Sequence, residues 1–223
     1  MSDIARDGLS LLDHFTKLDT AQWASTNDGA TGTNILHASH PHCMSVVTAA
    51  ADNDYQLMAS PAVMVSPTSS RGVELLARVI LTEAATNAAN WVVGLTDTVT
   101  SGNLQDNGAG PAASHDGMLF YKVDGTMTIK SEVSNGSTKT NQDVMTFTSG
   151  VWYKLRIVVN PLNATTALVT FVAINETTGE QVQKEARVAF ASLNGMRAVF
   201  GVKAGSAAAE TLTIDYIQVT AAA

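Results

Sequence analysis

Apolar and polar residues alternate through the second half of the chain. Across residues 151–159 every second residue is apolar, and Lys154 and Arg156 lie between them on the other face. This period of two is typical of a β-strand with one face on a core. Residues 167–175 are apolar on both faces, and the segments that flank them are rich in turn residues. We therefore predict antiparallel strands joined by turns across residues 151–190.

Two turn signals divide the middle of the chain into further strands. The dipeptide Asp-Gly at 124–125 lies between two apolar segments and is typical of a tight hairpin. The tripeptide Ser-Asn-Gly at 134–136 predicts a second turn. Residues 90–97 and 212–219 are further predicted strands.

The segment 73–89 is ambiguous. Its Glu, Leu, Ala and Arg residues favour a helix, whereas apolar residues at every second position from Val73 to Leu81 favour a strand. We predict a strand that extends to about residue 82. Residues 98–117 are small and polar, and loops of this length in compact domains are often functional or mobile.

This series of short strands predicts an all-β protein. A chain of 223 residues is within the range of a single all-β domain and is long enough to bury a large core. Two packed antiparallel sheets need many inward-facing apolar residues, which the alternating segments supply. We predict a two-sheet antiparallel β-sandwich that spans residues 13–220 as one domain, preceded by an N-terminal arm at residues 1–12.

Four motifs resemble those of one family of β-sandwiches. Asp13-x-Phe15-x-x-Leu18-Asp19-x-x-x-Trp23 resembles the first strand and turn of concanavalin A-like, or laminin G-like, jelly-roll domains. Three later segments resemble strands of that family in matching order, namely WVVGLTD at 91–97, GVWYKLR at 150–156 and LTIDYIQV at 212–219. The resemblance covers nearly the whole chain and implies a concanavalin A-like jelly roll in which the last strand pairs near the first. It implies no single function, because lectins, glycosidases, adhesion modules and viral structural proteins share this fold.

The charge of the chain argues against two kinds of partner. Its formal net charge is −7, and its 13 Lys and Arg residues are scattered singly. Because nucleic acids and anionic membranes are bound through clustered cations, we expect neither as a partner. The single Cys43 cannot form an internal disulfide, and the N-terminus does not resemble a secretory signal. We therefore expect the protein to be made in a reducing cytoplasm.

The sequence lacks the catalytic motifs of enzymes with this fold. The resemblance to glycosidases would require a Glu-x-Asp-x-(x)-Glu strand, since retaining hydrolysis needs two closely spaced carboxyl groups. No such triplet occurs, and Glu176, Glu180 and Glu185 are interpreted as solvated charges around a turn. A nucleophile elbow, Gly-x-Ser-x-Gly, is also missing. We predict that the chain is not an enzyme and has no catalytic residues.

Two segments contain the residue types that bind metals. His37, His40, His42 and Cys43 are all zinc-ligand types, but in an extended segment His40 and His42 share one face and the other two lie opposite. The loop at 98–117 and the residue before it offer oxygen donors for calcium, although their spacing matches no EF-hand: Asp97, Asn103, Asp106 and Asn107. A polar edge or loop is the favoured interpretation of the first segment and ordinary turn residues that of the second, so we predict no metal and no cofactor.

Sugar binding would need exposed aromatic side chains beside converging polar groups. Trp23, Trp91 and Trp152 all lie in motifs that resemble core positions of the family. Trp152 is on the more polar face of its strand, so it is the first candidate for a sugar contact, but a core position is favoured for it as well.

The leading functional hypothesis is a non-enzymatic virion structural protein. The missing catalytic motifs and the Ala-, Thr- and Gly-rich composition are similar to those of bacteriophage capsid decoration, cement or tail-associated proteins. Its partner would be the major capsid protein or another virion protein, and we expect a homo-oligomer, a trimer or a dimer. Candidate contact residues in and beside the arm are Ile4, Leu9, Leu11 and Leu12, although Leu9 to Leu12 could equally join their own sandwich. The alternatives are a carbohydrate-binding, lectin-like module that binds a glycan and, third, a diverged glycosidase or lyase.

Overall fold

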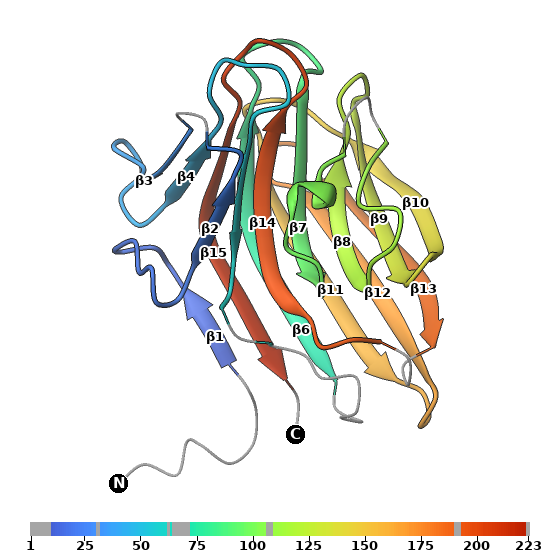
Figure 1. The fold of residues 1–223 in the computed structure, drawn as a ribbon. Helices are drawn as coiled ribbons and strands as arrows, with labels where there is room; N and C mark the ends of the chain where they lie inside the picture. Colours follow the sequence, from blue (N-terminus) through green and yellow to red (C-terminus); the bar gives the residue numbers. More distant parts are fainter. Residues whose placement is uncertain are drawn as a thin grey trace, which may run out of the picture.

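The structure of the protein is a computed structural model in which two antiparallel β-sheets pack face to face (Figure 1). It describes residues 10–29, 32–61, 63, 72–105, 109–189 and 193–221. The only helical element among these residues is a single 3₁₀ turn, η1 (Ser101–Asn103). No helix in the described part of the chain is long and apolar enough to cross a membrane.

The eight-stranded sheet, here called sheet A, contains both ends of the described chain. Its strands in spatial order are β13 (Gln181–Ala189), β12 (Thr166–Asn175), β11 (Trp152–Pro161), β6 (Val73–Thr82), β15 (Thr211–Ala221), β4 (Met44–Val47) and β3 (Thr33–Leu36), with β1 (Ser10–Asp13) also paired to β15. In the seven-stranded sheet B the order is β10 (Thr138–Thr146), β9 (Thr128–Asn135), β8 (Gly117–Lys122), β7 (Ala89–Thr96), β14 (Arg197–Ala204), β5 (Tyr55–Ala59) and β2 (Ala24–Asn27).

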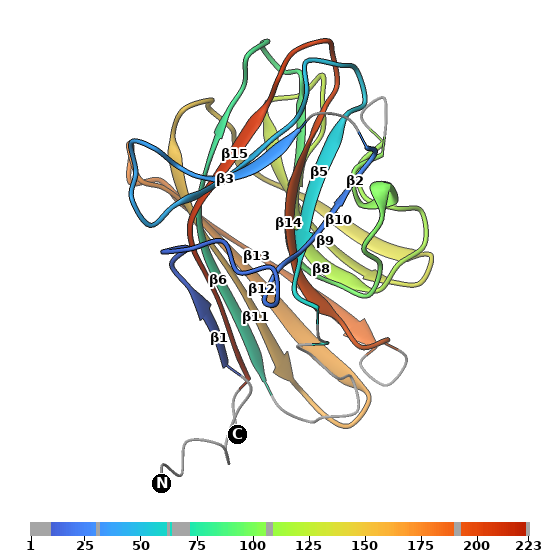
Figure 2. The ribbon, with the colours of Figure 1, turned by 60° about the vertical axis from the view of Figure 1, so that its left-hand side comes forward.

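The predicted strands are confirmed. The ambiguous segment forms β6 and ends at Thr82, the segment 151–190 contains β11, β12 and β13, and the Asp-Gly turn joins β8 to β9. The last strand, β15, pairs with β1, as the family resemblance implied (Figure 2). Residues 10–12, which we predicted to belong to the arm, are part of β1, and the rest of the arm lies outside the described residues.

The N-terminal motif is held together by its first aspartate. The carboxylate of Asp13 accepts hydrogen bonds from the backbone N–H of Phe15 at 2.7 Å and from the indole N–H of Trp23 at 2.8 Å. Both rings are buried, and each contacts Phe200 of β14 edge-on. The spacing Asp-x-Phe and the later Trp therefore seat two aromatic side chains between the sheets, which explains why this motif begins the domain.

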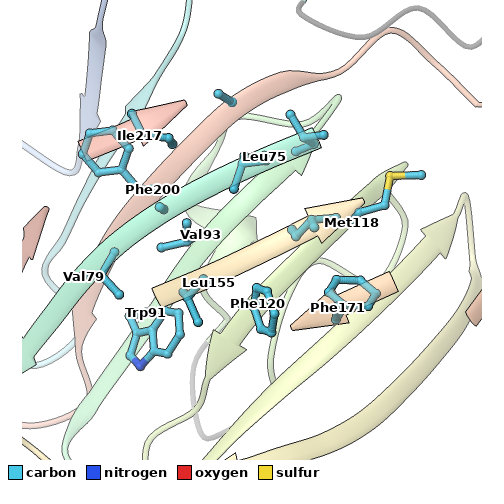
Figure 3. Close-up of a cluster of buried hydrophobic side chains, with 14 of the residues drawn as sticks. Leu75, Val79, Trp91, Val93, Met118, Phe120, Leu155, Phe171, Phe200 and Ile217 are labelled. Atoms are coloured by element: carbon cyan, nitrogen blue, oxygen red, sulfur yellow. The ribbon is translucent and has the colours of Figure 1, made fainter. Parts of the chain in front are cut away.

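The main core fills the space between the two sheets. Leu75 and Val79 of β6 and Leu155 of β11 point inward from sheet A and meet Trp91, Phe120 and other side chains of sheet B (Figure 3). The remaining inward residues of β6 and β11 follow the same alternation. Each of these two strands therefore buries one face in the core and turns the other face outward.

Sheet B differs from sheet A because its central strands β7 and β8 are covered on both faces. Every residue of β7 and β8 is buried. The described residues between them, 97–105 and 109–116, include η1 and run over the outer face of the sheet (Figure 1). Leu104 from this segment is buried in a second apolar cluster on that face, together with Leu57, Val92 and Leu119. The outer face of sheet A, in contrast, has exposed polar side chains on its central strands.

Candidate functional site

A network of charged side chains lies on the outer face of sheet A. Arg78 of β6 donates from Nε to Glu176 and from Nη1 to Asp215, both at 2.9 Å. Lys154 of β11 contacts the other oxygen of Glu176 at 3.0 Å. Neighbouring strands place these groups together, because Arg78 is paired with Lys154 on one side and with Tyr216 of β15 on the other. The network thus spans three central strands.

The electrostatics of this network keep Glu176 and Arg78 ionised. Partial burial alone would raise the pKa of Glu176, but hydrogen bonds from Arg78 and Lys154 outweigh it and lower the pKa. Burial alone would lower the pKa of Arg78, whereas its bonds to Glu176 and Asp215 raise it. Charged hydrogen bonds of this kind also fix the orientation of the side chains.

A bulge in β15 is what brings Asp215 and Tyr216 to this face. Strict alternation would point Tyr216 into the core, but the register of β15 with β6 shifts between Ile214 and Tyr216. The extra residue allows Ile214 and Ile217 both to be completely buried. The sequence signal is the interval of three, in place of two, between these isoleucines, and bulges of this kind often reorient functional side chains.

Trp152 also lies on the outer face, which corrects the core position favoured from the sequence. Its side chain is half-buried, and the guanidinium of Arg78 lies 4.1 Å from the centre of its ring. The ring of His40 approaches it edge-on at 6.0 Å. Trp23 and Trp91, in contrast, are buried in the core as predicted. Trp152 therefore borders the charged network, with one ring face occupied by Arg78.

A shallow depression of about 260 Å³ lies next to the network. Two adjacent cross-strand rows form it, one running from Tyr216 through Lys154 and the other through Leu76. Its floor is apolar and its rim is polar: Leu76, Val172 and Ile174 are joined by Lys154, Arg156, Gln181, Gln183 and Tyr216. The volume is just below the range of drug-sized ligand pockets, so it suits a single small ring.

Tyr216 supplies the aromatic surface of this depression. Partial burial, together with the nearby Glu176 and Asp215, outweighs the effect of the cations and raises the pKa of the phenol, so the hydroxyl is protonated at neutral pH. The imidazole of His14 packs against the ring with their centres 5.7 Å apart. The half-buried ring can therefore present both an apolar edge and a hydroxyl to a ligand.

A larger hollow runs along the seam between the edge strands β10 and β13. It measures about 920 Å³ and is lined by polar residues that include Gln142, Asp143, Lys184 and Glu185. Gln142 bridges the two sheets by donating to the carbonyl of Glu185 at 2.9 Å. The described lining has no aromatic side chain and no apolar floor, so the hollow lacks the features that the depression on sheet A combines.

The histidine-rich turn does not assemble a metal site. His37 and His40 come together, with their Nδ1 atoms 3.1 Å apart, instead of the predicted pair His40 and His42. Cys43 turns toward Asp215 at 3.8 Å, and burial and that carboxylate raise the pKa of its thiol to about 11. The segment is a turn between β3 and β4, so the alternation of an extended strand does not apply. No group of three or more metal-ligand side chains occurs among the described residues.

The calcium-donor residues of the long loop are engaged in holding the loop in place. Asp97 accepts from the backbone N–H of Asp116 and from the side chain of Asn194, while Asn103 accepts from the backbone N–H of Thr100. The other two candidates, Asp106 and Asn107, lie outside the described residues. The described donors therefore have a structural explanation.

The remaining predicted residues are placed as follows. Leu11 is buried in the main core, whereas the side chain of Leu12 is 51% exposed on the outer side of β1. Ile4 and Leu9 lie outside the described residues, and a partner-contact role for these four residues stays a prediction. Glu180 and Glu185 are exposed as expected of solvated charges, but Glu176 belongs to the charged network.

Most of this site could not be found from sequence patterns. Lys154 and Arg156 were recognised as outward-facing, but Arg78 and Asp215 are 137 positions apart, and no local pattern predicts their contact. Tyr216 could have been located only from the interval between the isoleucines of β15.

Comparisons with known proteins support the fold. No protein-family model matches the sequence, and no curated protein matches it. Lectin II from Ulex europaeus is similar in structure, with 11% identity, a TM-score of 0.69, and coverage of 97% of this chain and 100% of the lectin. The carbohydrate recognition domain of Emp47p has 11% identity and a TM-score of 0.63, with both chains covered completely. A protein of unknown function from Shewanella oneidensis MR-1 has 13% identity and a TM-score of 0.63, with 100% of this chain and 90% of that protein covered. At these identities the similarity shows the fold alone, which is the concanavalin A-like jelly roll.

Proposed function

We propose that this protein is a carbohydrate-binding module that holds a saccharide in the depression on the outer face of sheet A. The observation that carries the proposal is the combination of an apolar floor, the ring of Tyr216 and a polar rim in one depression. A pyranose ring has an apolar C–H face and a periphery of hydroxyl groups. The first fits an aromatic or aliphatic surface and the second needs converging polar groups, which is the pattern of small-ligand sites in general.

The rigidity of the surrounding face supports this proposal. Tyr216 and Lys154 lie on the central strands β15 and β11, and Arg78 between them is fixed by two carboxylates and by the ring of Trp152. Binding groups on packed strands lose little conformational entropy when a ligand binds, which matters for the weak contacts that sugars make.

The comparisons also favour carbohydrate binding over the virion role that leads the hypotheses from sequence. The similar structures include a plant lectin and a carbohydrate recognition domain, so the fold is one on which carbohydrate recognition occurs. The virion role, its capsid partner, the homo-oligomer and the virion location stay predictions. Nothing about the described surface requires catalysis, and the lectin-like structures are consistent with a protein that is not an enzyme.

The test is a glycan-array measurement on the whole chain, followed by calorimetry with each saccharide that binds. We expect Tyr216→Ala to abolish or weaken binding at least tenfold, because it removes the aromatic surface. Gln181→Ala changes an exposed rim residue and should weaken binding severalfold without a risk to folding. Tyr55→Ala, a half-buried tyrosine on sheet B, is the matched control and should leave binding unchanged. Saccharide binding that survives both Tyr216→Ala and Gln181→Ala would place the site elsewhere and overturn the proposal.

A further inference from the structure

We infer that the saccharide bound in this depression is acidic, carrying a carboxylate or a sulfate group. This inference rests on the proposed function, because it concerns the ligand class of the same site. The observation behind it is the charge of the lining: two cations, Lys154 and Arg156, and no carboxylate among the described residues that form it. A neutral saccharide does not require two cations in the lining of its site.

Lys154 has hydrogen-bonding capacity left over. Its ammonium group has three donors, and its one contact among the described residues is with Glu176 at 3.0 Å. The side chain is 51% exposed and lines the depression, so a ligand there can reach its other donors. A ligand acceptor can therefore bind to Lys154 without displacing Glu176.

Arg156 provides a second set of open donors. Its Nε donates to Glu74 at 2.5 Å, while its two terminal NH₂ groups bond to none of the described residues. Its side chain is 49% exposed and lies beside the apolar floor formed by Leu76 and Val172. A planar guanidinium with free NH₂ groups matches the geometry of a carboxylate or sulfate.

Three carboxylates near the depression bind cations, and a fourth, Glu185, accepts from the side-chain amide of Gln183 at 3.0 Å. Glu176 binds Arg78 and Lys154, Asp215 binds Arg78, and Glu74 binds Arg156. The charged groups of the lining therefore offer donors only, whereas the amides of Gln181 and Gln183 and the hydroxyl of Tyr216 also carry acceptor oxygens. A ligand rich in acceptors satisfies these donors, and a charged acceptor satisfies them best.

The net charge of −7 does not reverse this preference. A ligand carboxylate in the depression would lie within hydrogen-bonding distance of Lys154 or Arg156, whereas charges on the remainder of the surface are screened over about 8 Å at physiological ionic strength. The negative net charge is instead expected to slow association at low salt, whereas the attraction to Lys154 and Arg156 is the contribution that weakens as salt is raised.

The experiment compares two ligands that differ only in charge: an oligogalacturonic acid and the same oligomer with its carboxyl groups reduced to alcohols. Binding to the whole protein is measured by calorimetry at low and at high salt. We expect the acidic oligomer to bind about tenfold or more tightly than the reduced one, and to lose this advantage as salt is raised.

Two variants and a matched control locate the effect. Lys154→Gln and Arg156→Gln should each weaken binding of the acidic oligomer about tenfold and that of the reduced oligomer by a clearly smaller factor, because each side chain is also part of the polar rim. Arg187→Gln makes the same change of charge at an exposed position of β13 outside the depression, and should have little effect. Both tested side chains are about half exposed, so folding should be preserved.

The outcomes separate this inference from the proposed function. Equal affinity for the two oligomers, or an acidic preference that Lys154→Gln and Arg156→Gln leave intact, would overturn the inference while binding at the depression still stands. If neither oligomer nor any saccharide of a glycan array binds, the proposed function itself fails, and the inference fails with it.

Discussion

The two outer faces of the sandwich differ in what covers them. On sheet B the segment between β7 and β8 packs on the sheet, so that Leu104 joins Leu57, Val92 and Leu119 in a second apolar cluster. On sheet A the corresponding face carries charged and aromatic side chains that are half-buried or exposed. The strands record this difference, since β7 and β8 are buried throughout whereas β11 alternates. A strand that is covered on both faces can be apolar throughout, whereas a strand with one uncovered face alternates apolar and polar residues.

The largest expected effect is the loss of stability on truncating Leu104, which tests whether the second apolar cluster stabilises the fold as a core does. Leu104→Ala should destabilise the protein by about 2–5 kcal/mol, because it leaves a cavity under the covering segment. Leu12→Ala, on the outer side of sheet A, removes a side chain that is 51% exposed and should cost less than about 0.5 kcal/mol. Urea unfolding of both variants measures the difference. Similar, small losses for the two leucines would mean that the second cluster contributes little stability.

The strands of both faces were predictable, but the cover was not. The alternation of Val73 to Leu81 locates β6 because one face of that strand meets solvent. The covering segment is small and polar, with few apolar residues, so its composition does not reveal that it packs on a sheet. Its position depends on distant contacts, such as that between Asn194 and Asp97, which no local pattern encodes. The same holds for the site on sheet A, where the Arg78–Asp215 pair joins separate strands.

Two carboxylates beside opposite sheets respond to pH in opposite ways, and the first is the buried Asp54 next to sheet B. At the turn into β5, burial and the neighbouring Asp28 raise the pKa of Asp54 to about 6, from its ordinary value of 3.8. At Asp54 the folded protein therefore binds a proton more tightly than the unfolded chain does. As pH rises from about 4 to about 6, deprotonation of Asp54 lowers the free energy of unfolding.

Asp54→Asn should remove this loss. The amide can still accept from the backbone N–H of Ala49 and no longer repels Asp28. We expect the variant to be more stable than the wild type at pH 7, by about 1–3 kcal/mol, and nearly equal to it below about pH 4. Thermal or urea unfolding across this range of pH provides the measurement. An unchanged pH dependence in the variant would show that another group titrates there.

A paired carboxylate of sheet A should behave in the reverse sense. Although burial alone would raise the pKa of Glu176, its bonds to Arg78 and Lys154 lower it below the ordinary value of 4.5. Its stabilising effect is thus present above about pH 4.5 and is lost as pH falls. Glu176→Gln should cost about 1 kcal/mol at pH 7, since the network is partly exposed, and the cost should shrink toward pH 3. If Glu176→Gln lowers the free energy of unfolding by the same amount at pH 3 as at pH 7, the effect comes from packing and not from charge.

The smallest expected effect concerns how much Glu74 reduces the affinity of the depression for an acidic saccharide. Glu74 competes with an acidic saccharide for Arg156, because it binds the Nε of that side chain. Glu74→Gln removes the competing charge, and both side chains are substantially exposed, so the affinity for the acidic oligomer should rise only about two- to threefold. Calorimetry with the charged and the reduced oligomers measures this change. In the Arg156→Gln background the gain should disappear, because the two substitutions act on one contact. If Glu74→Gln still raises the affinity in the Arg156→Gln background, Glu74 acts through the general charge of this face. The open donors of Arg156 would then contribute less to recognition than the geometry of the depression indicates.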